Sequence, residues 1–149
     1  EGAFFLQVYG PALRMIVVGA VQSAQALVPL ARLAGFDVTL IDPRTAFATP
    51  ERFPETRILT EWAETVLPGL APDSRTAVIT LTHDPKLDDP ALIRALTSPA
   101  FYIGALGSRK THAKRLERLR TEGIGENALA RLQAPVGLPI GAVSPAEMY

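Results

Sequence analysis

The feature that most constrains the fold is a buried-strand pattern followed at once by a helix pattern near the start of the sequence. Leu13 to Val18 is a short, almost wholly apolar run that ends at Gly19. Such runs are typical of strands buried on both faces, as parallel sheets require. Ala20 to Ala34 then carries apolar residues at helical spacing, and Gly35 follows as a stop signal. This unit predicts a strand, a tight turn and a helix that packs back on the strand.

Strand and helix patterns continue to alternate along the sequence. Further strands are expected at 36–41, 57–60, 76–82 and 101–103, helices at 61–67, 88–96, 109–121 and 126–132, and a loop at 135–141. Asp88 or Asp89 is expected to begin its helix, with Pro90 in the first turn, where proline is tolerated. Alternation of this kind predicts right-handed crossovers. We therefore expect an α/β fold: a Rossmann-like, doubly wound, mainly parallel sheet of five or six strands with helices on both faces.

The two ends of the sequence are expected to extend beyond this alternating core. Residues 1–12 carry several large apolar side chains before a Gly-Pro pair, which favours an N-terminal arm or lead-in strand that ends in a turn. Residues 13–149 then form the Rossmann-type domain. Ser144 to Glu147 is a good helix start, yet the sequence ends two residues later. We therefore expect this sequence to be a fragment of a longer chain.

Composition argues against several classes of protein. No apolar run approaches the roughly 20 residues of a membrane span, because polar residues interrupt the longest candidate, Met15 to Ala34. The absence of cysteine and of a basic signal-peptide start favours a cytoplasmic protein with no membrane partner. Equal numbers of acidic and basic residues, 15 of each, make nucleic acid an unexpected partner. Two histidines without cysteines do not indicate a metal site.

The turn after the first strand is the first candidate binding site. Glycine permits a tight turn there, and free amides at a helix N-terminus hold phosphate. The dinucleotide fingerprint has glycines at offsets zero, two and five, where this sequence has Gly19, Val21 and Ala24. The third position accepts alanine, but the Val21 side chain stands where pyrophosphate approaches the backbone. Gly19, Ala20, Val21 and Gln22 are thus candidates for binding an anionic or nucleotide-like ligand, and a turn kept for folding alone is the alternative.

Asp42 and Arg44 follow the second strand and form the next candidate pair. Asp42 lies 23 residues after Gly19, about where a ribose-binding carboxylate belongs. Arg44 is placed to meet a phosphate instead. The alternative is that Asp42 caps the turn into Pro43, a role that aspartate fills well.

Polar residues gather directly after the strand expected at 76–82. Thr82, His83, Asp84 and Lys86 lie outside the carboxyl end of that strand, where ligands bind in open α/β sheets. A histidine beside an aspartate and a lysine is suited to proton transfer or to orienting an anionic group. His83 and Asp84 are therefore the best catalytic candidates, although no nucleophile-elbow pattern is present to support a catalytic triad.

The segment after the strand at 101–103 repeats the chemistry of the first turn. A glycine-containing loop leads into a helix start with a serine cap and two cations, a combination that suits phosphate. The candidate binding residues here are Gly104, Leu106, Gly107, Ser108, Arg109 and Lys110. Six basic residues lie between Arg109 and Arg120, against Glu117 alone. The later four, Lys114, Arg115, Arg118 and Arg120, are interpreted as a solvated helix face.

Several of these segments together resemble a known family. The segments are Gly19 to Leu27, Val38 to Arg44, Phe47 to Phe53, Leu81 to Asp89 and Tyr102 to Arg109. They are similar to the C-terminal Rossmann domain of the XdhC/CoxI family, the accessory factors of xanthine dehydrogenase and related molybdenum hydroxylases. The resemblance covers residues 13–149.

The resemblance implies a chaperone rather than an enzyme. Members bind molybdenum cofactor as cargo, protect it during sulfuration by a cysteine desulfurase, and deliver it to apo-xanthine dehydrogenase or a related molybdoenzyme. Family members commonly have histidine where this sequence has Gln22, so a role of that imidazole does not carry over. Longer members also carry an N-terminal domain with cysteines, so a thiolate contact to molybdenum does not come from this sequence.

Two other functions stay open from the sequence. The fold and Asp42 permit an NAD(P)-binding oxidoreductase domain, because this scaffold hosts many functions. Val21 and Gln22 instead favour an interaction domain that has lost its ligand site. A homodimer is compatible with every one of these functions.

Overall fold

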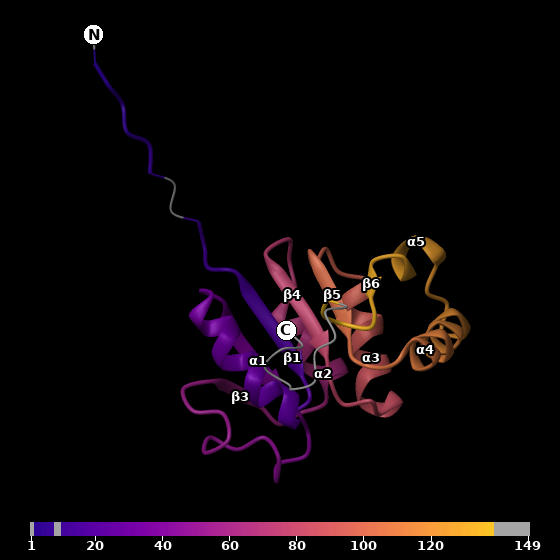
Figure 1. Cartoon of the computed structure of the whole chain (residues 1–149). Helices are drawn as coiled ribbons and strands as arrows, with labels where there is room; N and C mark the ends of the chain where they lie inside the picture. Colours follow the sequence, from indigo (N-terminus) through magenta and orange to yellow (C-terminus); the bar gives the residue numbers. More distant parts are fainter. Residues whose placement is uncertain (1, 8–9, 139–149) are drawn as a thin grey trace.

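Six parallel strands form the sheet in the computed structural model, which describes residues 2–7 and 10–138. The strands are β1 (Arg14–Val18), β2 (Asp37–Ile41), β3 (Arg57–Leu59), β4 (Thr76–Thr80), β5 (Tyr102–Ala105) and β6 (Leu132–Gln133). Their order across the sheet is β3-β2-β1-β4-β5-β6 (Figure 1). The sheet therefore grows from β1 first through β2 to β3 on one side, and then through β4 and β5 to β6 on the other side. The topological switch point lies between β1 and β4.

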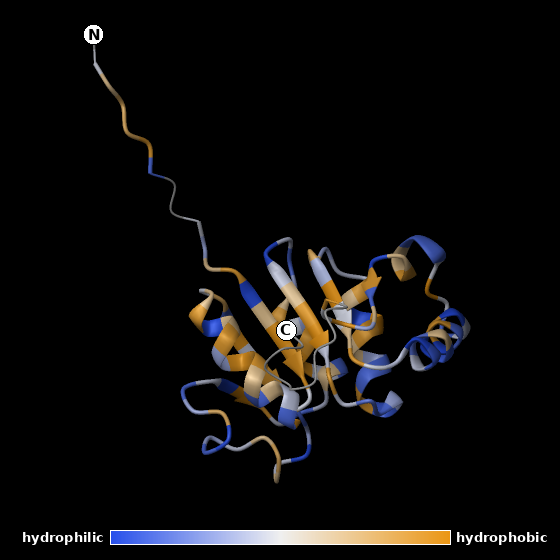
Figure 2. Ribbon diagram, in the orientation of Figure 1, coloured by the Kyte–Doolittle hydropathy of each residue, from blue (hydrophilic) through white to orange (hydrophobic). Residues whose placement is uncertain are grey.

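Helices cover both faces of the sheet. They are α1 (Gln22–Leu33), α2 (Ala63–Leu70), α3 (Pro85–Leu96), α4 (Arg109–Thr121) and α5 (Glu126–Leu129). Alternate residues of β1 point to opposite sides: Val17 packs with the apolar residues of α1, whereas Ile16 packs with those of α2 and α3. Figure 2 shows the hydrophobic residues concentrated along the strands, while α4 is largely hydrophilic. The expected Rossmann-like, doubly wound architecture is confirmed.

Several element boundaries differ from the sequence predictions. The helix expected at 88–96 begins at Pro85, because Asp84 and not Asp88 or Asp89 caps it. The strand expected at 101–103 extends to Ala105 and so includes Gly104. The sixth strand, β6, lies where a helical turn was expected to continue to residue 132. The helix predicted at 109–121 has the expected bounds.

The first residues lie away from the sheet and its helices, and the structure describes the chain only as far as residue 138. Residues 2–7 form no strand and extend away from the domain in Figure 1, and the Phe4 side chain is 99% exposed. The helix start expected at Ser144 lies outside the described residues, as does the end of the loop expected at 135–141. Within the described part of the chain, the helices are too short or too polar to span a bilayer.

Candidate functional site

The turn between β1 and α1 packs directly against the loop that follows β4. Gly19 has a φ of +115°, and its amide donates to the Ile41 carbonyl at 2.9 Å. A Cβ built on Gly19 would lie 2.6 Å from Cγ2 of Thr82, closer than real Cβ contacts. Glycine is therefore required here for its backbone conformation and for the close approach of Thr82. The contact brings two of the predicted candidate segments together at the switch point.

The backbone of Ala20 is held from both sides. Its amide donates to Oδ2 of Asp42 at 2.7 Å, and its carbonyl accepts from Nη1 of Arg52 at 2.8 Å. Nη2 of Arg52 also donates to Oε1 of Gln25, on the first turns of α1. Sequence reasoning missed Arg52 as a positioning residue, because a surface arginine in a loop gives no signal of the backbone it binds.

The N-terminus of α1 carries no side-chain cap. Val21 occupies the N-cap position and makes no capping hydrogen bond, and the first turn contains no acidic residue. The Val21 side chain is partly buried and packs against the core on the α1 face. Gln22 begins the helix with an exposed side chain. The positive end of this helix is therefore not neutralised by its own residues, which suits it to an anion.

Asp42 is fully buried and serves the turn rather than a free ligand position. Its Oδ2 accepts from the Ala20 amide and from Nη2 of Arg44, each at 2.7 Å. Its Oδ1 accepts from the amide and Nε of Arg44, each at 2.9 Å. Burial works to raise the pKa of Asp42, but these hydrogen bonds outweigh burial and hold it below its ordinary value. Both oxygens are thus engaged within the protein, which favours the turn-capping interpretation over ribose binding.

The loop between β4 and α3 is organised by Asp88 from inside α3. Oδ1 of Asp88 accepts from the Thr82 hydroxyl at 2.6 Å, and Oδ2 accepts from the His83 amide at 3.1 Å. Burial raises the pKa of Asp88 above its ordinary value, against the lowering effect of the Thr82 hydrogen bonds. His83 is exposed and has a φ of +63°, a conformation that L residues seldom adopt. The buried carboxylate therefore holds a strained loop that presents His83 at the sheet edge.

Asp84 and Asp89 have structural partners of their own. Asp84 is the N-cap of α3, and its Oδ1 accepts from the Lys86 amide at 2.9 Å. Asp89 accepts from Nε of Arg118 at 2.5 Å and from Nη2 at 3.1 Å. The expectation that Asp88 and Asp89 simply begin the helix is wrong, because the Asp-Pro cap places both one turn inside it. His83 is left as the polar side chain of this loop that faces solvent without a capping role.

Gly104 does not belong to the loop after β5. It lies within that strand, and a Cβ on it would approach Tyr102 at 2.8 Å and Val136 at 2.9 Å. Its small size therefore serves packing inside the strand, which argues against the prediction that Gly104 binds an anion. The loop proper begins at Leu106, whose amide donates to the Thr80 carbonyl at 2.9 Å. This bond places the β5–α4 loop beside the end of β4.

The remaining residues of that loop form a capped helix start with free cations. Gly107 has a φ of +140° and approaches Thr111 closely. Ser108 is the N-cap of α4, and its Oγ accepts from the Thr111 amide at 3.1 Å. Arg109 and Lys110 are exposed in the first turn, which contains no acidic residue. The helix N-terminus and its cations thus face solvent at the same edge as His83.

The later basic residues of α4 are not a uniformly solvated face. Arg115 is only 1% exposed, and its Nη2 donates to the Leu106 carbonyl at 2.9 Å. Arg118 pairs with Asp89, and Arg120 pairs with Glu126. Lys114 matches the expectation of an exposed side chain. The solvated-face interpretation is therefore wrong for Arg115, which holds the β5–α4 loop from below.

The candidate segments meet along the carboxyl edge of the sheet in the order of their strands. The Asp42–Arg44 turn follows β2, the Gly19 turn follows β1, and the loops at Thr82 and Leu106 follow β4 and β5. Across this edge, Asp84 and Asp88 add to the effect of Asp42 in raising the pKa of Arg44. Within residues 2–7 and 10–138, no three His, Cys, Asp or Glu side chains gather as metal ligands do. The arrangement is suited to holding an anionic ligand through amides and cations.

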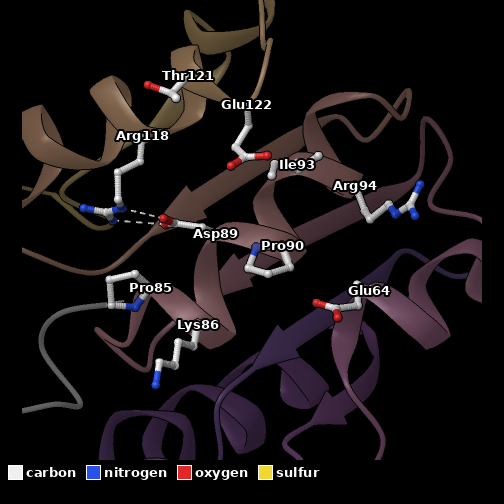
Figure 3. A pocket seen from close by; sticks show the side chains of 10 residues that line it. All are labelled: Glu64, Pro85, Lys86, Asp89, Pro90, Ile93, Arg94, Arg118, Thr121 and Glu122. Atoms are coloured by element: carbon white, nitrogen blue, oxygen red, sulfur yellow. Dashed lines mark hydrogen bonds and ion pairs between the residues drawn. The ribbon is translucent and has the colours of Figure 1, made fainter.

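A cavity of about 810 Å³ lies among α2, α3 and α4, and no residue of the turn after β1 lines it. Figure 3 shows Arg118 reaching across to Asp89 on one wall, with Glu64 at the opposite end. Pro85 and Lys86 line the end nearest the β4–α3 loop. The sequence gives no signal of this cavity, because its lining comes from three helices that are separated along the chain.

Comparison with known proteins gives a consistent result. Residues 15–148 match the protein family described as the XdhC Rossmann domain. The chain is 32% identical over 130 residues to the molybdenum cofactor insertion chaperone PaoD of Escherichia coli, covering 87% of this chain and 35% of that protein. It is 32% identical over 145 residues to a Bacillus subtilis protein named as a probable component of xanthine dehydrogenase, covering 97% of this chain and 42% of that protein.

A solved structure is similar over nearly the same extent. The crystal structure of a protein named as a xanthine dehydrogenase from Bacillus halodurans superimposes with a TM-score of 0.79 at 29% identity. The match covers 94% of this chain and 40% of that one. The chain thus spans about a third to two fifths of the length of these relatives.

Proposed function

Because the chain belongs to the XdhC family, we propose that it binds molybdenum cofactor as cargo and assists its insertion into a molybdoenzyme. The client is xanthine dehydrogenase or a related molybdenum hydroxylase, and the cofactor is held during sulfuration. The name of PaoD, a relative at 32% identity, supports the insertion role. The function is that of a chaperone rather than an enzyme, since the protein hands its ligand over.

One observation carries the proposal at the level of residues. The uncapped N-terminus of α1 and the cationic N-terminus of α4 belong to loops that lie along one edge, next to the switch point. The pyranopterin of the cofactor bears a phosphate, sometimes extended to a dinucleotide, and phosphates bind helix N-termini and cations. We assign phosphate contact to Ser108, Arg109 and Lys110, with further contact from the amides of Val21 and Gln22.

His83 completes the proposed site as a ligand-contact residue. It is exposed between the two helix N-termini, on a loop whose strained backbone is held by Asp88. An imidazole at this place is suited to orienting an anionic group or to moving a proton. Asp84 is a weaker catalytic candidate, because its carboxylate already caps α3.

The proposal is tested by titrating the apo protein with molybdenum cofactor and, separately, with a nucleotide that matches its dinucleotide form. Arg109→Ala, Lys110→Ala and Ser108→Ala are each expected to weaken binding by about tenfold to a hundredfold, since a hydrogen bond to a charged group contributes about 1.5–3 kcal/mol. Arg120→Ala is the matched control, because it removes the same charge from α4 at an exposed pair with Glu126. Unchanged binding in all three site variants refutes the assignment of the site. Absence of cofactor binding by the wild type refutes the function and favours a pure interaction domain.

An NAD(P)-binding oxidoreductase domain is the second candidate. The strand order is that of dinucleotide-binding folds, which favours it. The four hydrogen bonds that Asp42 accepts from Ala20 and Arg44 weigh against it, because no acceptor is left for a ribose hydroxyl. Calorimetry with NAD(H) and NADP(H) separates the two: tight binding with hydride transfer reverses our order.

The proposed partners are the apo-molybdoenzyme and a cysteine desulfurase, with a homodimer as a further proposal. Each of these three proposed partners predicts a different result in solution. Mixing with the cofactor-free client or with the desulfurase should produce a complex in size-exclusion chromatography with light scattering. The chain alone should show a doubled mass if it forms a homodimer. Elution at the unmixed masses would contradict the corresponding partner.

A further inference from the structure

A second, smaller cavity lies between the β4–α3 loop and α4. Its volume is about 80 Å³, room for a few water molecules or one phosphate-sized anion, since a water takes about 30 Å³ in the liquid. The side chains that matter here are His83 of the loop, Asp88 of α3, and Lys114, Arg115 and Arg118 of α4. The cavity shares His83 with the residues proposed to contact the cofactor, but Ser108, Arg109 and Lys110 do not line it.

The most unusual group in this cavity is the guanidinium of Arg115. The residue is 1% exposed, yet Nε and Nη1 find no hydrogen-bond partner among the described residues. Its third nitrogen, Nη2, donates to the Leu106 carbonyl and lies 4.0 Å from Oδ2 of Asp88. Buried polar groups in folded proteins are nearly always hydrogen-bonded, and a buried donor that is left without a partner is costly. Burial accordingly lowers the pKa of Arg115, with Asp88 acting in the opposite direction.

The neighbouring carboxylates are already committed elsewhere. Both oxygens of Asp88 accept hydrogen bonds from the loop at Thr82 and His83, and Asp89 forms two bonds with Arg118. The exposed ammonium of Lys114 adds a third basic side chain to the lining. Unused donors and a local excess of positive charge therefore remain, which is the chemistry that recognises an anion.

We propose that this cavity is a binding site for a phosphate-type oxyanion, with Arg115 as its buried donor and Lys114 at its rim. The ligand is either free inorganic phosphate or the phosphoryl group of a phosphomonoester whose remainder stays outside. Nε and Nη1 are covered by protein atoms, so the guanidinium must shift slightly to meet the anion. Such a ligand would bridge α4 and the loop that carries His83. The inference does not depend on the cofactor proposal.

The test is thermal unfolding of the whole chain in phosphate-free buffer at constant ionic strength, with inorganic phosphate in one arm and adenosine monophosphate in the other. A ligand that binds only the folded state raises the melting temperature, and the rise grows with the logarithm of the ligand concentration above the dissociation constant. We expect protection of the wild type and of the matched control Arg120→Gln. Arg115→Gln should weaken binding by about tenfold or more, and Lys114→Gln by a few-fold.

Comparison of the two ligands and of the variants identifies what the cavity binds. Stronger protection by the phosphomonoester assigns the site to a phosphoryl group, and protection by inorganic phosphate alone assigns it to the free anion. If Arg115→Gln does not fold, Lys114→Gln decides the question, because its side chain is exposed. No protection by either probe, or equal protection of the wild type and both cavity variants, overturns the proposal. Arg109→Ala should leave this binding intact, which separates its failure from that of the cofactor site.

Discussion

Replacing Gly19 by alanine tests whether the close approach of two loops defines the candidate site. The new methyl group would meet Cγ2 of Thr82 at 2.6 Å and its amide nitrogen at 3.3 Å, at a backbone φ of +115°. Gly35 is the matched control, because its φ is +91° and nothing lies within 4 Å of a Cβ built there. Gly35→Ala should therefore show backbone strain alone, whereas Gly19→Ala adds a steric clash.

The expected losses in the free energy of unfolding follow from the backbone strain and the steric clash. A positive φ costs an L residue about 1–2 kcal/mol, and forcing a methyl group into a packed site adds about 1–3 kcal/mol. Gly35→Ala should thus lower the free energy of unfolding by about 1–2 kcal/mol, and Gly19→Ala by about 2–5 kcal/mol. Urea unfolding followed by circular dichroism measures both free energies.

A second substitution identifies the clash as the cause. Thr82→Ser removes Cγ2 but keeps the hydroxyl that donates to Asp88 at 2.6 Å. In that background, Gly19→Ala should recover about 1 kcal/mol relative to additivity, as residues in contact do. Equal losses for Gly19→Ala and Gly35→Ala, or a coupling energy near zero, would refute the close-approach argument.

The remaining predictions concern Asp42, which holds the turn after β1, and Asp84, which caps α3. Asp42→Asn should lower the free energy of unfolding by about 2–3 kcal/mol at neutral pH, because an amide has one acceptor oxygen and so loses either the bonds at Oδ1 from Arg44 or those at Oδ2 from Ala20 and Arg44. Since the pKa of Asp42 is lowered in the folded state, its stabilisation is complete above the unfolded pKa of about 3.9 and is lost as pH falls through the folded value. Urea titrations of wild type and Asp42→Asn should therefore converge in acid, and parallel curves would contradict this. Asp84→Ala removes the α3 cap and should cost about 1 kcal/mol, with Asp84→Asn, which also caps, losing less.

The sequence predicts the fold well because its local signals agree with one another. Leu13 to Val18 reads as a buried strand, and β1 occupies nearly the same residues. Gly35 is expected to end α1, and it follows that helix with a φ of +91°. The strand β6 could not be predicted, because two residues that pair with β5 carry no periodicity of their own.

Within the candidate site, positions in the chain were predicted better than roles. Asp42 is expected at the end of the second strand, but only the structure shows that all its acceptor capacity faces Ala20 and Arg44. The sequence predicts that the strand β5 ends at 103, two residues early, and therefore assigns Gly104 to a ligand-binding loop. Such errors arise because hydrogen-bond partners far apart in the sequence leave no periodic signal.

The helical spacing of Arg115 and Leu119 indicates that Arg115 is buried, but the many basic residues around it suggest an exposed helix face. Residues four apart lie on one face of a helix, and Arg115 precedes the fully buried Leu119 by that spacing. The surrounding run of basic residues favoured a solvated face instead. Asp88 shows the same pattern, since it precedes the buried Leu92 by four residues once the helix is begun at Pro85.

These two buried charges hold the backbone of the loops from inside the helices that follow them. Asp88 holds the Thr82–His83 backbone from within α3, and Arg115 holds the Leu106 carbonyl from within α4. The two charges lie 4.0 Å apart, so the supports of neighbouring loops also contact each other. Because a buried ion is destabilising when its partner is removed, a change at either support should disturb both loops. Exposed residues such as His83 and Arg109 can therefore change the ligand chemistry of the edge while its geometry stays fixed.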